Sequence, residues 1–151
     1  VHVNGECAVP PDGKGATINY NNETIIVTLD ADGVAIIPSD WTFVPKHAFM
    51  FCDDLKKIET PAGITRIQSY AFYRSGLTEL LFSVDSRLET IGAVAFFGTN
   101  VTSVVFPGSV TEILNEAFSY SALETVSFGA NKGSKLETIG TAVSFFISLY
   151  S

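Results

Sequence analysis

Cysteine and histidine are the residue types in this chain that could support nucleophilic or metal chemistry, and there are only two of each. They are Cys7, Cys52, His2 and His47. A catalytic thiol needs a neighbouring base that lowers its pKa, and these two histidines are the only imidazoles. Structural zinc sites use four cysteine or histidine ligands at short spacings, which the sequence lacks. We therefore expect no catalytic residue and no metal site.

Cys52 also has a purely structural interpretation. It occupies a position of an internal repeat that is held elsewhere by Ser75, Thr99 and Ser121, all of them small. Cysteine behaves as a small apolar residue in protein cores. A buried Cys52 is therefore the favoured interpretation, and a disulfide with Cys7 is the alternative.

The acidic sequence Asp30-Ala31-Asp32-Gly33 is similar to the start of a calcium-binding loop. A complete EF-hand loop would need acids where this chain has Thr28 and Ser39. Because Asp-Gly is a strong hairpin signal, we expect a turn instead. No phosphate-binding, dinucleotide-binding or serine-hydrolase motif occurs. We expect no cofactor and no enzymatic activity.

Composition limits the partners. The formal net charge is −7, and the nine Lys and Arg residues are scattered along the chain. Binding to nucleic acid or to anionic membranes requires clustered cations, so neither is expected. Apolar residues form no run of about 18, the length needed for a membrane-spanning helix, so we also expect no membrane insertion. Hydrophobic residues nevertheless make up 46 % of the chain, and these must be buried regularly or meet a partner.

An internal repeat organises the apolar residues. The dipeptide Ala-Phe starts at Ala48, Ala71, Ala95 and Ala117, at intervals of 23, 24 and 22 residues. These intervals lie in the range of leucine-rich repeats. Differences in repeat length fall in one loop, such as that between Phe82 and Leu88. Insertions confined to one loop leave a stacked core intact.

The repeat predicts a stacked structure. Three segments alternate apolar and polar residues and are expected to be strands of one parallel sheet: Thr78–Phe82, Thr102–Phe106 and Glu124–Phe128. The stretch around each Ala-Phe is expected to form a short helical turn. The repeated phenylalanines should stack as one internal column, each burying on the order of 150–250 Å²: Phe49, Phe72, Phe96 and Phe118.

Three regions follow from this pattern. Residues 1–35 do not fit the repeat, and the β-rich run Thr24–Leu29, with Val34–Ile37 as its returning strand, predicts a β-hairpin cap. Residues 36–143 carry about four repeats with terminal half-repeats. Residues 144–151 form an apolar tail. Since so few polar side chains are present there, we expect an assembly interface made by Phe145, Phe146, Leu149 and Tyr150.

The segment from Ala48 to Ile67, which reads AFMFCDDLKKIETPAGITRI, resembles the BspA-like leucine-rich repeat. The resemblance implies a repeat solenoid of the leucine-rich-repeat type, rich in β-strands. It also implies a secreted or cell-surface protein with a role in adhesion or protein binding, and no defined ligand. We therefore expect a non-enzymatic protein-binding or adhesion module, with a protein or a glycan as its partner. The alternative is a structural subunit or filament protomer that assembles through its solenoid ends.

Two kinds of surface residue are candidates for function. Outward residues of the predicted strands would form the binding surface: Lys57, Glu59, Glu79, Leu81, Ser103, Val105, Thr125 and Ser127. The sequons at Asn22 and Asn100 are predicted glycosylation sites.

Overall fold

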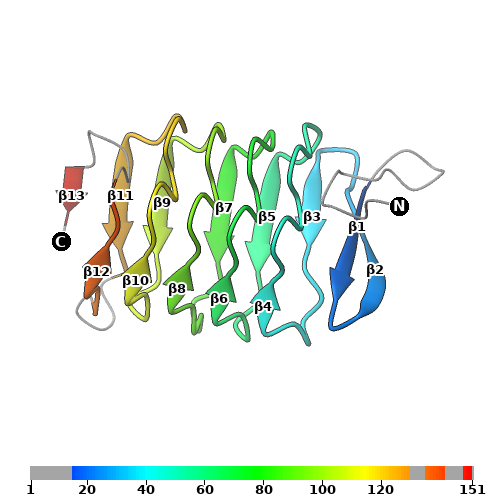
Figure 1. Cartoon of the computed structure of the whole chain (residues 1–151), viewed down its shortest axis with the longest axis horizontal. Coiled ribbons are helices and arrows are strands. Elements are labelled where there is room, and N and C mark those ends of the chain that lie inside the picture. Colours follow the sequence, from blue (N-terminus) through cyan, green and yellow to red (C-terminus); the bar gives the residue numbers. More distant parts are fainter. Residues whose placement is uncertain (1–14, 130–134, 142–147, 151) are drawn as a thin grey trace.

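The computed structural model describes residues 15–129, 135–141 and 148–150, and within these ranges every regular element is a β-strand. The chain winds into a solenoid, and successive coils contribute parallel strands to two layers (Figure 1). One layer, the front sheet, contains β3 (Val34–Ile36), β5 (Lys57–Thr60), β7 (Glu79–Phe82), β9 (Ser103–Phe106), β11 (Thr125–Phe128) and β13 (Ser148–Tyr150). The other, the back sheet, contains β4 (Phe43–Val44), β6 (Arg66–Ile67), β8 (Thr90–Ile91), β10 (Glu112–Ile113) and β12 (Thr138–Ile139).

The core lies between the two sheets and confirms the repeat register. The four repeated phenylalanine rings are all fully buried, and consecutive rings stack at 5.2, 5.0 and 4.9 Å between centroids. The alanine before each phenylalanine is buried as well, which lets adjacent coils approach closely. Inward residues of the strands, such as Ile58, Leu80 and Val104, complete the core. The predicted strands are present as β7, β9 and β11, and each begins one residue later than expected. The expectation that all three pair in one sheet is wrong, because β7 pairs only with β5, whereas β9 and β11 pair with each other.

The predicted helical turns around Ala-Phe are consecutive tight turns and not helices. Within them, N–H groups donate to carbonyls three residues earlier, as from Ala48 to Pro45 at 3.2 Å. Two positions in each turn adopt positive φ: the residue just before the alanine and the residue three positions after it. Examples are His47 at 62° and Phe51 at 58°. A right-handed helix cannot pass through such residues. The turns also bond from coil to coil, as when the Phe49 N–H donates to the Ala71 carbonyl at 2.6 Å.

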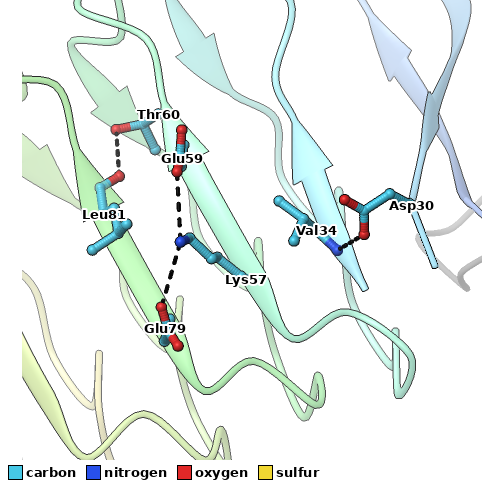
Figure 2. A network of polar contacts seen from close by, with 7 residues as sticks. All are labelled: Asp30, Val34, Lys57, Glu59, Thr60, Glu79 and Leu81. Carbon is cyan, nitrogen blue, oxygen red and sulfur yellow. Dashed lines mark hydrogen bonds and ion pairs between the residues drawn. The ribbon is translucent and has the colours of Figure 1, made fainter. Parts of the chain in front are cut away.

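A β-hairpin lies at the N-terminal end of the solenoid. The run Thr24–Leu29 and a further expected strand, Ala16–Tyr20, are present as its two strands, but the predicted pairing with Val34–Ile37 is wrong. β1 (Gly15–Tyr20) pairs antiparallel with β2 (Glu23–Thr28), and Asn21 and Asn22 make the turn at φ 51° and 65°. The expected returning strand, β3, instead pairs in parallel with β5 as the first strand of the front sheet. The Asp-Gly turn is present, because Asp30 Oδ1 accepts from the Val34 N–H at 2.9 Å (Figure 2). It leads the chain into the solenoid through a single antiparallel bridge between Leu29 and Ala35.

Candidate functional site

The eight residues predicted to form a binding surface lie on the front sheet and point outward. Their strands keep one register, so that Lys57 pairs with Glu79 and Ser103 pairs with Thr125. Lys57 and Ser127 are half-buried, and the other six side chains are exposed. The sheet therefore brings together residues that lie up to about seventy positions apart in the sequence.

The N-terminal part of this face is charged. Lys57 Nζ lies 3.7 Å from Glu59 Oε1 and 3.6 Å from Glu79 Oε2 (Figure 2). Both carboxylates are well exposed, so each ion pair contributes at most about 1 kcal/mol to stability. In the middle of the face, Leu81 and Val105 point outward with 42 % and 59 % of their surfaces exposed. Thr125 and Ser127 follow on β11, so charged, apolar and hydroxyl side chains occupy successive parts of this face.

A seam divides the front sheet between β7 and β9. Hydrogen-bonded ladders join β3 to β5 to β7 and, separately, β9 to β11 to β13. The back sheet is a continuous ladder of all five of its strands. β7 and β9 still lie side by side, in the middle of the row of strands (Figure 1). The break is therefore local to one layer of the solenoid.

Two features of the sequence coincide with the seam. At the end of β11, the Gly129 N–H donates to the Phe106 carbonyl at 2.8 Å, but the corresponding position after β9 is Pro107, which has no N–H to donate. The connection that follows β7 is also two residues longer than those that follow β5 and β9. In the other repeats, the N–H at the position of Asn100 donates to the residue that corresponds to Ser75, as from Ala122 to Thr99. The Asn100 N–H instead donates to the Leu77 carbonyl at 2.9 Å, which is two residues further along the chain. The two coils are thus shifted relative to one another.

A hollow of about 1030 Å³ opens at the seam. Exposed apolar side chains, Leu81 and Val105, line it together with the turn Ser83–Arg87 and with Ser109. Ser109 Oγ donates to the Leu88 carbonyl at 2.7 Å, which ties this rim to the preceding coil. Charged groups of both signs surround the opening: Asp85, Arg87, Glu89 and Lys135. An apolar centre with a polar rim is the usual anatomy of a protein interface.

Three of the predicted surface residues, Leu81, Ser103 and Val105, line this hollow. The other five lie on the flanking strands: Lys57, Glu59, Glu79, Thr125 and Ser127. Sequence reasoning missed the rim formed by Ser83–Arg87. The length of this connection was the available signal, since insertions in a solenoid often lie on its binding face.

The remaining predicted sites are placed as follows. Asn22 and Asn100 are both exposed. Cys52 is fully buried, while Cys7 lies outside the described residues, so their pairing stays a prediction. Phe145 and Phe146 also lie outside the described residues. The backbones of Leu149 and Tyr150 belong to β13, which pairs in parallel with β11.

Glycosylation at Asn100 and Asn22 gives a direct test of the secretory interpretation. When the chain is secreted from a eukaryotic cell, we expect a glycan on each asparagine, because both side chains are exposed. Intact-mass measurement before and after enzymatic removal of N-glycans would detect them. Asn100→Gln and Asn22→Gln should each remove one glycan. Secreted wild-type protein with no added mass would contradict the prediction.

His47 is half-buried. Partial burial lowers the pKa of its imidazole below the ordinary value, and the neighbouring Lys46 charge lowers it further. Its ring contacts that of Tyr70 at 5.3 Å. Within the described part of the chain, no three His, Cys, Asp or Glu side chains are grouped as metal ligands. No helix long and apolar enough to cross a bilayer occurs there either.

Comparisons with known proteins agree with this architecture. The model of the BspA type leucine rich repeat region matches residues 34–145 in six copies. The crystal structure of the pneumococcal vaccine antigen PcpA superposes with a TM-score of 0.62 and 23 % sequence identity, covering 82 % of this chain. The aligned part spans 40 % of the PcpA chain, so the likeness supports the fold alone. No curated protein is detectably similar in sequence. Since the family model covers most of the chain, this protein belongs to the BspA-type leucine-rich repeat family.

Proposed function

We propose that this chain is a non-enzymatic protein-binding module of a cell-surface or secreted protein, and that it binds through the hollow at the seam. Repeat solenoids present extended surfaces that serve recognition. The family and the likeness to a vaccine antigen support a surface role. An adhesive function follows if the partner is part of a host cell or matrix.

The observation that carries the proposal is the position of the hollow. It interrupts an otherwise regular sheet at the place where Leu81 and Val105 expose their side chains. Because β7 and β9 lie side by side, a bound segment in extended conformation would lie over the hollow and place its side chains against Leu81 and Val105. The partner we infer is therefore an extended protein segment with apolar side chains.

Peptide display tests this proposal. Random peptides of about 12 residues, long enough to cross the hollow at about 3.3 Å per residue, would be selected on the wild-type protein. We expect the selected peptides to bind Leu81→Glu and Val105→Glu at least tenfold more weakly, as for central interface residues. Biolayer interferometry with the purified variants gives the dissociation constants.

Ile36→Glu is the matched control. Ile36 points outward from β3 of the same sheet and is 78 % exposed, but it does not line the hollow. Binding to this variant should be unchanged. Peptides that bind all three variants equally well, or that lose affinity only with Ile36→Glu, would refute the hollow as the binding site.

A second candidate function is assembly through the C-terminal end of the solenoid. Ile67, Ile91 and Ile113 are buried in the back sheet, whereas the equivalent Ile139 on the edge strand β12 is 51 % exposed. Exposed apolar edges favour pairing with another chain. Light scattering tests this assembly. We expect the molar mass of the wild type to rise with protein concentration and that of Ile139→Lys to stay at the monomer value. A wild type that remains monomeric at every concentration would exclude assembly.

A further inference from the structure

An exposed ladder of aromatic rings runs along the side of the solenoid formed by the Ala-Phe turns. We call it the aromatic strip, and it consists of Phe51, Tyr73, Phe97 and Tyr120. Neighbouring ring centroids lie 5.6, 5.1 and 5.0 Å apart. Phe51 is 44 % exposed and Tyr120 is 85 % exposed, while the two central rings are half-buried. Buried phenylalanines already fill the core, so the strip is an additional aromatic surface.

The turn geometry creates the strip. Phe51 and Tyr120 occupy the positive-φ position three residues after the repeated alanine, at 58° and 55°. Tyr73 and Phe97 come two residues after it. A non-glycine residue with positive φ is uncommon, and large aromatic residues at two of these positions are not required by the core. A role at the surface would explain them.

Cations accompany these rings. The Arg74 guanidinium lies 5.7 Å from the Tyr73 ring centroid. Lys46 Nζ lies 6.0 Å from the ring of Tyr70, which in turn contacts Tyr73 at 5.6 Å. Neither cation forms an ion pair with a described residue.

The side of the solenoid that bears the strip is less acidic than the rest of the chain. The four turns from residues 45–53, 68–76, 92–100 and 114–122 contain two cations, Lys46 and Arg74, and two carboxylates, Asp53 in the first turn and Glu116 in the last, so their formal charge is zero. The whole chain, by contrast, carries a net charge of −7. The front face has Glu59 and Glu79 beside Lys57, so the two faces differ in charge.

The stacking decides which part of each ring meets a partner. Tyr73 and Phe97 stack at an interplanar angle of 22°, and Phe51 and Tyr120 cover their outer sides. The stacked faces of the central rings are therefore closed to a partner. Arg74, Lys46 and the tyrosine hydroxyls are hydrogen-bond donors beside these rings, and such donors favour carboxylates.

We propose that the aromatic strip is a second docking surface, which binds an acidic segment of a partner protein whose Asp or Glu residues alternate with apolar side chains. Tyrosine and arginine are the residue types enriched at the energetic centres of protein interfaces. A glycan would instead need open ring faces on which to stack. The strip lies on the turns and not on the front sheet, so it is independent of the hollow.

Fluorescence anisotropy on the intact chain tests the proposal. The probe is a labelled peptide of about 12 residues that alternates Glu with Leu and Pro, long enough to span the strip at about 3.3 Å per residue. The comparison probe has Lys in place of every Glu. We expect the Glu peptide to bind at least tenfold more tightly, and its affinity to fall as salt screens the cations.

Variants of the strip should weaken this binding. Two double variants are compared. One combines Lys46→Glu with Arg74→Glu, and the other combines Phe51→Ser with Tyr120→Ser. Each double variant should bind the Glu peptide at least tenfold more weakly than the wild type does. Arg66→Glu reverses one positive charge on the exposed outer side of the back sheet, and Ile36→Ser changes an apolar side chain that is 78 % exposed. Both controls should bind as wild type does. Circular dichroism confirms that every variant is folded.

Several results would overturn the proposal. The Glu and Lys peptides could bind equally, or the strip variants could bind as the controls do. Absence of binding at about 1 mM peptide, the weak limit of useful affinity, would also refute it. Binding of a sialylated oligosaccharide or of anionic lipid vesicles in place of the peptide would assign the strip to another class of partner. None of these outcomes affects the peptide selection at the hollow.

Discussion

Replacement of Phe96 by alanine is expected to lower the free energy of unfolding by about 3–5 kcal/mol. Phe96 is fully buried and stacks on Phe72 at 5.0 Å and on Phe118 at 4.9 Å. Alanine would leave a cavity in the middle of this column, and the close-packed coils on both sides could collapse only partly. Urea denaturation followed by circular dichroism would measure the loss through the midpoint and the slope.

Phe51→Ala is the matched control for this substitution. It removes the same side chain from a position that is 44 % exposed, so less apolar surface is lost and no closed cavity forms. We expect a cost of about 1 kcal/mol, typical of partly exposed positions. Equal losses of stability in Phe96→Ala and Phe51→Ala would contradict the assignment of the core column.

Replacement of Trp41 by alanine should have a comparable effect of about 3–5 kcal/mol. Trp41 is 1 % exposed, and its ring stacks on Tyr20 with 4.5 Å between centroids and an interplanar angle of 1°. Tyr20 belongs to the β1–β2 hairpin, so this stack joins the hairpin to the first coil. Its loss should also release the hairpin, with faster amide hydrogen exchange across Glu23–Thr28 than across β9.

Tyr20→Phe separates the ring stack from its hydrogen bond. The Thr42 N–H donates to the Tyr20 hydroxyl at 3.0 Å, and phenylalanine removes this acceptor while it keeps the aromatic contacts. The expected cost is about 1 kcal/mol, with little change in hairpin exchange. If Trp41→Ala proved no more harmful than Tyr20→Phe, or left exchange in the hairpin unchanged, the hairpin would not depend on Trp41.

The sequence by itself determined the solenoid, because the same apolar positions recur in every repeat. A position that is buried in one coil is expected to be buried in the next. The sequence alone therefore assigns four residues to one column: Phe49, Phe72, Phe96 and Phe118. Alternation along Thr102–Phe106 determined which strand residues point outward, since successive strand side chains face opposite sides. The predicted surface residues, Leu81 and Val105 among them, follow from this local rule.

Features that break the repeat required the tertiary structure. Hairpin pairing was predicted from the Asp-Gly turn, but Val34–Ile36 pairs in parallel with β5 in the front sheet. Periodicity indicates how often Ala-Phe recurs but not the φ of its neighbours, so tight turns were mistaken for helical ones.

The two proposed binding surfaces illustrate the same limit. The seam coincides with a two-residue length difference and with Pro107, and neither alone predicts a broken ladder. The aromatic strip joins residues from two different repeat positions, such as Phe51 and Tyr73, which no alignment of the repeats would place in one row. Sequence periodicity records what successive coils share, whereas these surfaces arise from the ways in which adjacent coils differ. Only the packing of one coil on the next decides how such differences are placed in space.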